Sequence, residues 1–191
     1  EGIKKAVSLE TKINYVKACS IRDTINYDIQ SAVKAVESSD VAIVFVGGSS
    51  ARDFETQYIE TGAAKVNTQI ILSDMDCGEG FDRASLELLG KQNELLEAIA
   101  KTGKPFIVVY IQGRPLNMNF SAEKANALLT AWYPGEEGGN AIADILFGDY
   151  NPSGRLPISI PRSEGQLPIY YSKNNTKEYI DEKLGPLYTF G

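Results

Sequence analysis

The stretch CGEGFDR, residues 77–83, places one carboxylate between two glycines, directly ahead of an acid–base pair. Glycine tolerates backbone conformations that other residues avoid, so the flanking glycines can present Glu79 in a cavity shared with other groups. A carboxyl group there could act as a general acid if burial or a second carboxylate raised its pKa. The neighbouring sequence offers no obvious second carboxylate, so we expect that group to come from elsewhere in the protein.

The chain of 191 residues contains no histidine. Ser-His-Asp and Cys-His nucleophile systems and histidine-based zinc sites are therefore excluded within it. Proton transfer would have to use Asp, Glu, Lys, Tyr or Cys side chains. The two cysteines, Cys19 and Cys77, are far apart in sequence and form no CxxC pair, so we expect both to be free thiols.

Charge and composition exclude several classes of partner. The net charge of −6 leaves no Lys/Arg stripe to displace counterions from phosphates, which argues against nucleic acid. No apolar run is long enough to span a membrane. Residues 47–50, Gly-Gly-Ser-Ser, follow a strand candidate but lack the GxGxxG and GK[ST] patterns, so nucleotide binding is not favoured. The length suits one domain, residues 1–191.

Strand and helix patterns alternate along the chain. Helical spacing predicts a helix after Asp28, a second that includes Gln92 and ends at Gly103, and a third through residues 141–146 that ends at Gly148, with Glu136 and Glu137 near its start. Apolar or alternating runs predict strands at residues 12–16, 41–48, 106–113, within 125–135, and at 156–161. This alternation predicts an α/β three-layer sandwich with a mainly parallel sheet of about five to six strands and helices on both faces.

A long polar stretch runs from Ser49 to about Arg83 and leaves the carboxyl end of the strand at 41–48. Ligands bind at that end of the strands in such sheets, so the location favours a functional role for Glu79. Asp82 and Arg83 are interpreted as a structural pair that holds the loop onto the following helix. The only tryptophan, Trp132, is expected to pack beneath a tight turn rather than to contact substrate.

Several long phrases resemble the C-terminal α/β sandwich domain of glycoside hydrolase family 3, the family of β-glucosidases, β-xylosidases and β-N-acetylhexosaminidases. They are GEGFDRASLELLGKQNELLEAI, KPFIVVYIQGRPL, AWYPGEEGGNAIADILFGDYNPSGRLPISIPRSEGQLPIYY and PLYTFG. The resemblance implies a partner, an N-terminal TIM-barrel domain of the same full-length chain, which supplies the nucleophile Asp and most sugar contacts. It also implies retaining hydrolysis of β-linked sugars without a metal or organic cofactor.

In this family the sandwich domain supplies the general acid/base, and Glu79 best matches the family's glutamate in the phrase EGxDR. Glu60 and Glu55, in the same loop, are competing candidates. Nothing here resembles the barrel, so the chain by itself is expected to be inactive. The alternative is a non-catalytic carbohydrate-binding or interaction module. The compartment stays open, with a periplasmic or secreted bacterial location favoured over the cytoplasm.

Overall fold

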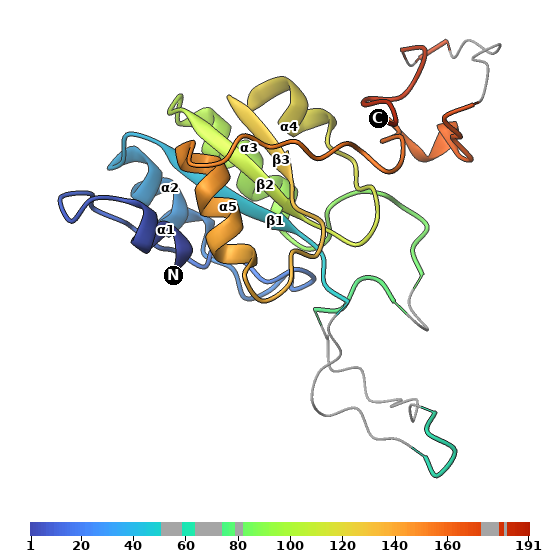
Figure 1. Ribbon diagram of the computed structural model, residues 1–191, viewed down its shortest axis with the longest axis horizontal. Coiled ribbons are helices and arrows are strands. Elements are labelled where there is room, and N and C mark those ends of the chain that lie inside the picture. Colours follow the sequence, from blue (N-terminus) through green and yellow to red (C-terminus); the bar gives the residue numbers. More distant parts are fainter. Residues whose placement is uncertain (51–58, 64–73, 79–81, 173–179, 182) are drawn as a thin grey trace.

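A parallel three-stranded sheet forms the centre of the computed structural model, which describes residues 1–50, 59–63, 74–78, 82–172, 180–181 and 183–191. The strands lie in the order β1 (Ala42–Gly47), β2 (Phe106–Ile111) and β3 (Ala127–Thr130) (Figure 1). Val44 of β1 aligns with Val108 of β2, which in turn aligns with Leu128 of β3. Because all three strands run in the same direction, their carboxyl ends meet at one edge of the sheet.

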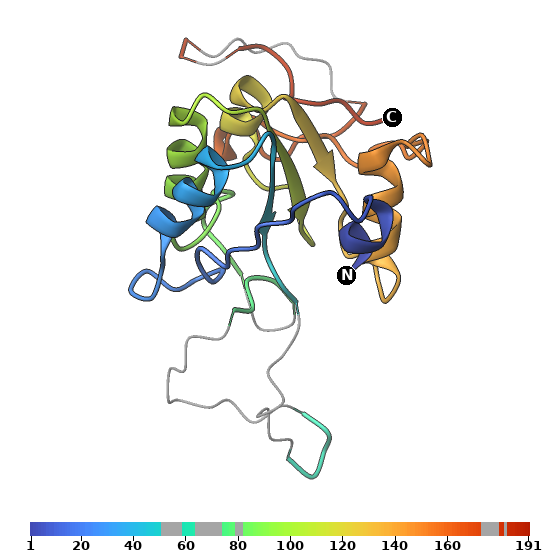
Figure 2. The same cartoon turned by 90° about the vertical axis from the view of Figure 1, so that its left-hand side faces the viewer.

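Helices cover both faces of this sheet. α2 (Ile29–Glu37) and α3 (Gln92–Lys101) lie on one side, and α1 (Gly2–Ala6) and α5 (Gly138–Phe147) lie on the other (Figure 2). The short helix α4 (Asn119–Lys124) leads into β3, and a 3-10 turn, η1, spans Glu164–Gln166. Among the described helices, none combines the length and the apolar character that a membrane crossing requires.

The buried faces of β1 and α3 explain why these segments adopt their structures. Ala42, Val44 and Val46 alternate along β1 and are buried, which is the two-residue period of a strand. Along α3 the buried positions are those predicted from helical spacing: Gln92, Leu95, Leu96 and Ile99. The apolar side chains among them join one core, so α3 packs on β1.

The predicted helix boundaries are confirmed at three residues. The Asp28 carboxylate accepts a hydrogen bond of 2.9 Å from the backbone N–H of Ser31 and so caps α2. Gly148 ends α5 in the left-handed region at φ 86°, and Gly103, just after α3, has φ 69°.

The α/β class, the parallel sheet and the helices on both faces are confirmed, but the number of strands is smaller than predicted. The described residues form three strands rather than five to six. Residues 12–16 have no regular structure: Ile13 and Tyr15 are exposed, and the Asn14 side chain donates to the Ser39 hydroxyl at 3.1 Å. An alternating sequence forms a strand only where a neighbouring strand completes its hydrogen bonds.

The predicted strand at 156–161 is also wrong as an element of this sheet. It contributes an isolated antiparallel bridge between Ile160 and Tyr188, with a hydrogen bond of 2.8 Å from the Ile160 N–H to the Tyr188 carbonyl. Pro157 and Pro161 lack the N–H donors that a longer ladder needs, so pairing stops after this bridge.

One buried side chain fixes the carboxyl end of β1. Gly47 donates its N–H to Gln92 Oε1 at 2.7 Å, and Gln92 Nε2 donates to the Gly47 carbonyl at 2.9 Å. The amide therefore bonds Gly47 as a neighbouring strand would. Gln92 Nε2 also lies within hydrogen-bonding distance of the carbonyls of Leu89 and Ile21, at 3.1 and 3.3 Å. Three separate segments thus depend on one amide.

We expect Gln92→Leu to destabilise the protein by on the order of 2–4 kcal/mol, because it leaves the N–H and C=O of Gly47 buried without partners. Urea unfolding at neutral pH measures the change. Gln30→Leu is the matched control, since Gln30 lies on the exposed side of α2, and it should change stability by less than about 0.5 kcal/mol. Equal losses in the two variants would show that the Gln92 amide does not stabilise this edge.

Candidate functional site at the carboxyl edge of the sheet

Three segments converge where the strands end. Residues 48–50 follow β1, residues 112–114 follow β2 and residues 131–133 follow β3 (Figure 2). Residues 74–78 and 82–83, which lie far along the chain from β1, return to this edge through hydrogen bonds to Ser49 and its surroundings. We call residues 48–50 the first stem and residues 74–78 the second stem.

The side chain of Asp76 joins the two stems. Its Oδ1 accepts a hydrogen bond of 2.8 Å from the Ser49 N–H, and the Asp76 N–H donates to the Ser49 carbonyl at 2.9 Å. Gly48 leaves room for this carboxylate, because a Cβ on Gly48 would lie 2.1 Å from Asp76 Oδ1. The first stem therefore has a glycine next to an amide that binds an anion supplied by the chain itself.

Arg83 neutralises Asp76 from the other side. Its Nη1 lies 3.0 Å from Asp76 Oδ2, and the two side chains are only 7% and 2% exposed. Arg83 Nη2 also donates to the Glu87 carbonyl. The predicted Asp82–Arg83 pair that holds the loop onto the following helix is wrong in its partner, because Arg83 pairs with Asp76. Asp82 instead accepts from the Arg83 backbone N–H at 2.7 Å and lies 3.6 Å from Arg114.

A second pair of contacts ties the second stem to residues 21–22. Asp74 Oδ1 accepts hydrogen bonds from the backbone N–H groups of Ile21 and Arg22, at 3.0 and 3.3 Å. Arg22 Nη1 donates to the Met75 carbonyl at 3.2 Å. Since Ile21 also contacts Gln92, the second stem and the end of β1 share one anchored frame.

The Tyr133 hydroxyl contacts both stems. It lies 2.8 Å from Cys77 Sγ and forms a hydrogen bond with Ser50. Desolvation raises the pKa of the Tyr133 phenol, and the adjacent Cys77 raises that pKa further, so the hydroxyl stays protonated at neutral pH. Both cysteines, Cys19 and Cys77, are free, as predicted.

The three candidate carboxylates differ in what the structure describes. Glu79 and Glu55 lie outside the described residues. Glu60 is exposed in a turn at residues 59–63, in which the Ile59 N–H donates to the Ala63 carbonyl at 2.9 Å. Because Glu79 follows the second stem directly, its described neighbours on both sides are the ones held at the carboxyl edge. In the described part of the chain, no three His, Cys, Asp or Glu side chains are placed to hold a metal ion.

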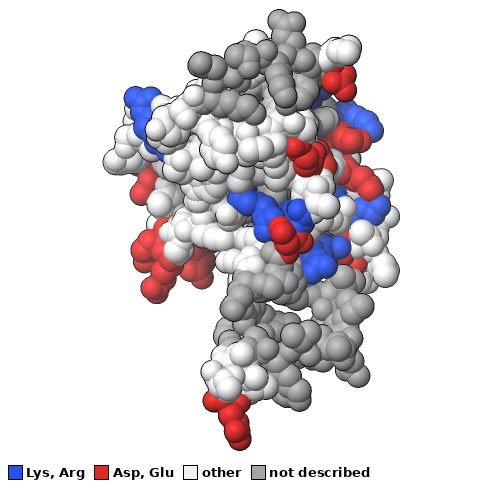
Figure 3. Space-filling model, turned by 90° about the vertical axis from the view of Figure 1, so that its right-hand side faces the viewer, with Lys and Arg blue, Asp and Glu red and all other residues white. Residues whose placement is uncertain are grey.

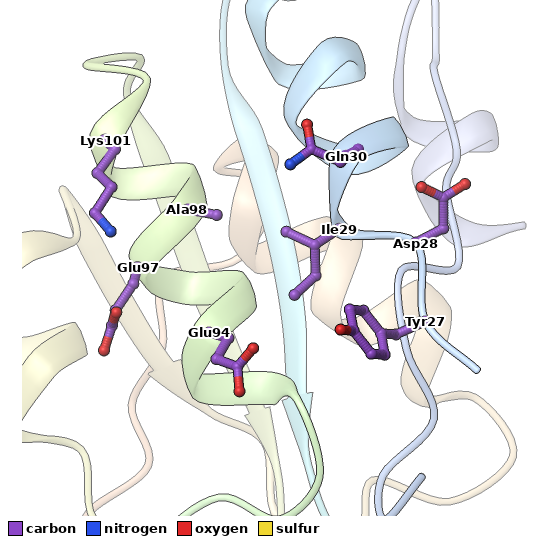
Figure 4. Close-up of a pocket in the computed structure, with 8 residues that line it drawn as sticks. All are labelled: Tyr27, Asp28, Ile29, Gln30, Glu94, Glu97, Ala98 and Lys101. Atoms are coloured by element: carbon purple, nitrogen blue, oxygen red, sulfur yellow. The ribbon is translucent and has the colours of Figure 1, made fainter. Parts of the chain in front are cut away.

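A surface groove of about 400 Å³ lies elsewhere, between α2 and α3 (Figure 4). Two of its carboxylates have partners: Asp28 caps α2, and Glu94 forms an ion pair of 2.5 Å with Lys91. The Lys91 ammonium also lies 5.3 Å from the centre of the Tyr27 ring. The residues that line the groove come from α2, α3 and residues 27–28 and not from the segments that follow the strands, so we do not take it as the candidate site.

Sequence reasoning missed the residues that build this edge. Nothing in the sequence distinguishes Asp76 from the other carboxylates between Ser49 and Arg83, although it is 4% exposed. Tyr133 was not singled out within its turn. Trp132, as predicted, packs partly buried against the core. On the face shown in Figure 3, acidic and basic side chains lie side by side near the centre, and acidic side chains gather at the lower left. Whether a polar side chain is buried depends on contacts between residues that are distant in sequence. The spacing of apolar residues does not predict such contacts.

We expect Arg83→Met to destabilise the protein by about 3–5 kcal/mol, because the Asp76 carboxylate would stay buried without its cation. Chemical denaturation measures the loss. Arg114→Met removes the exposed pair with Asp82 and should lose no more than about 1 kcal/mol. The double variant Asp76→Asn/Arg83→Met should lose less than the sum of its single changes; strictly additive losses would contradict a coupled pair.

Comparison with known proteins shows which family this chain resembles. The profile of the Glycosyl hydrolase family 3 C-terminal domain matches residues 1–191. A "Beta-xylosidase" of Formosa agariphila is 40% identical over 100% of this chain and 24% of its own length. A "Periplasmic beta-glucosidase" of Salmonella typhimurium is 36% identical over 100% of this chain and 26% of its own length. The chain thus spans about a quarter of the length of these curated relatives.

Solved structures of β-glucosidases are similar to this chain as well. The β-glucosidase EmGH1 from Erythrobacter marinus superimposes with a TM-score of 0.66 at 42% identity, over 85% of this chain and 20% of that one. The Listeria innocua β-glucosidase in complex with glucose gives a TM-score of 0.70 at 28% identity, over 89% of this chain and 22% of that one. Together with the full-length profile match and the parallel α/β sandwich, these similarities show that the chain belongs to glycoside hydrolase family 3, as its C-terminal domain.

Proposed function

We propose that this domain supplies the general acid/base of a retaining β-glycosidase and that Glu79 is the residue. One observation supports this most strongly: the described residues flanking Glu79 are fixed at the carboxyl edge by the buried Asp76–Arg83 pair, at 3.0 Å. An acid/base must stay within hydrogen-bonding reach of the oxygen it protonates, so such anchoring suits that role. Glu60, which is exposed, and Glu55 remain the competing candidates.

In the proposed mechanism the second carboxylate comes from the TIM-barrel domain of the full-length protein. Its Asp attacks the anomeric carbon while the Glu79 carboxyl group protonates the departing oxygen. The resulting glycosyl–enzyme ester is hydrolysed by a water molecule whose proton Glu79, now ionised, accepts. Retention of configuration requires the two carboxyl groups to lie about 5–5.5 Å apart. The 191-residue chain alone would lack the nucleophile, so we expect it not to turn over glycosides.

The proposed substrates are terminal β-linked sugars of oligosaccharides or glycosides. The relatives named above are a β-xylosidase and β-glucosidases, so xyloside and glucoside are the two sugars to test first. We also propose a periplasmic or secreted location, which the similarity to the periplasmic enzyme of Salmonella typhimurium supports.

A second candidate function is carbohydrate binding without catalysis. It is favoured by exposed aromatic side chains near the C-terminal end, where the rings of Tyr171 and Phe190 lie 5.0 Å apart. Such rings can stack on sugars, which would give this segment affinity for oligosaccharides without the barrel. Titration of the 191-residue chain with xylo- and cello-oligosaccharides tests it, and binding lost in Tyr171→Ala would favour this function.

We expect Glu79→Gln in the full-length enzyme to lower kcat/KM by about 10²–10⁴ for glycosides with poor leaving groups, which need protonation. Dinitrophenolate is a leaving group that departs without a proton. The rate of the glycosylation step for dinitrophenyl glycosides should therefore fall far less. The basic limb of the pH profile should disappear, since it reports loss of the acid's proton. Azide, which attacks the glycosyl–enzyme without base assistance, should restore turnover.

Glu60→Gln and Glu55→Gln are the matched controls for this experiment, because both are glutamates of the same loop. Neither should show leaving-group dependence or azide rescue. If one of them shows both effects and Glu79→Gln shows neither, the acid/base assignment moves to that residue.

A further inference from the structure

The Tyr133 hydroxyl occupies a position between two segments that are distant in sequence. It lies 2.8 Å from Cys77 Sγ, a contact across 56 residues, and forms a hydrogen bond with Ser50. Ser50 belongs to the first stem and Cys77 to the second. One phenol therefore connects the first stem and the second stem, which are the two ends of the segment that leaves β1 and returns to the edge of the sheet.

The backbone holds Tyr133 firmly in this place. Trp132 has φ 51°, a left-handed conformation that non-glycine residues rarely adopt, and its carbonyl accepts a hydrogen bond of 3.2 Å from the Gln112 N–H. The Tyr133 ring lies directly over Gly113: a Cβ at that position would be 2.6 Å from the ring atom Cε2. Strand β3 and the end of β2 thus set where the hydroxyl points.

Two successive residues of the second stem form anchoring contacts with other segments. Asp76 is bound by Ser49 and Arg83, as described above, and Cys77 is bound by Tyr133. Glu79 follows Cys77 by two residues, and two residues of chain span at most about 7 Å. The position of Cys77 therefore limits the region that the backbone of Glu79 can reach.

We propose that Tyr133 is a positioning residue for the acid/base of this domain, acting through Cys77 and Ser50. The inference rests on the proposed role of Glu79. The 41% exposure of Tyr133 leaves its ring at the surface of this edge, but its hydroxyl is committed to the two stems. Loss of that hydroxyl should loosen the stem and reduce proton donation to the leaving group, while the sugar contacts made elsewhere stay intact.

The test is Tyr133→Phe in the full-length enzyme, which keeps the ring over Gly113 and removes only the hydroxyl. We expect kcat/KM for alkyl β-glycosides to fall about tenfold, because small misplacements of a catalytic group have effects of this size or larger. For dinitrophenyl glycosides the fall should stay below about twofold, since their departure needs no proton. Rates are normalised to active sites titrated with a fluoroglycoside inactivator, which removes any contribution from misfolded protein.

A purely structural role would lower both substrates by the same factor, and direct sugar binding would raise KM for both; either result overturns the proposal. Tyr150→Phe is the control, because Tyr150 is exposed and its hydroxyl lies 3.5 Å from Ser153 Oγ. It should leave both rates unchanged.

Cys77 provides an independent arm that does not alter Tyr133. Cys77→Ser keeps a hydrogen-bonding partner and should retain most activity on alkyl glycosides, whereas Cys77→Ala should resemble Tyr133→Phe. The combination Tyr133→Phe/Cys77→Ala should be no worse than Tyr133→Phe alone, because that change already removes the contact with Cys77. Independent, multiplying losses would overturn the proposal.

The outcomes also separate this inference from the proposed function. If Glu79→Gln shows the leaving-group signature and Tyr133→Phe does not, only the positioning role fails. If Glu79→Gln lacks the signature, the acid/base assignment fails, and the Tyr133 proposal fails with it.

Discussion

The carboxyl edge of the sheet depends on one buried carboxylate. Asp76 is 4% exposed and draws together the Ser49 amide, at 2.8 Å, and the Arg83 guanidinium, at 3.0 Å. Burial of a carboxylate is unfavourable unless a cation and hydrogen-bond donors replace its water, and here both do so. The two stems and the segment after residue 81 therefore assemble as a unit, because no one of them satisfies Asp76 alone.

This arrangement explains the glycines at the end of β1. Gly47 and Gly48 followed by serine suggest a loop for binding phosphate, but the amide of Ser49 instead binds the carboxylate of Asp76. The small size of Gly48 lets that carboxylate approach the backbone. The end of β1 can thus bind an anion, and here it binds a carboxylate of the same chain. This contact holds a loop at the edge where a ligand would otherwise bind.

The sequence predicted elements whose causes are local. The period of buried residues in α3, the apolar run of β1 and the cap at Asp28 are all set within a few residues. Residues 12–16 have the same local pattern as a strand, yet a strand also needs a neighbour, which the pattern does not contain. Asp76 and Tyr133 were missed for a related reason: their partners lie 27 and 56 residues away. A carboxylate that will be buried and one that will be solvated look alike in sequence.

Two of the side chains that hold this edge share a chemical property. Gln92 carries no titratable group, and the pKa of Tyr133 is raised above its ordinary value. A general acid/base must change protonation state twice in each catalytic cycle. If its supports also titrated in that range, each proton transfer would disturb the geometry that the next one needs. Supports whose charge does not change avoid this coupling, which suits the proposed role of a carboxyl group that follows the second stem.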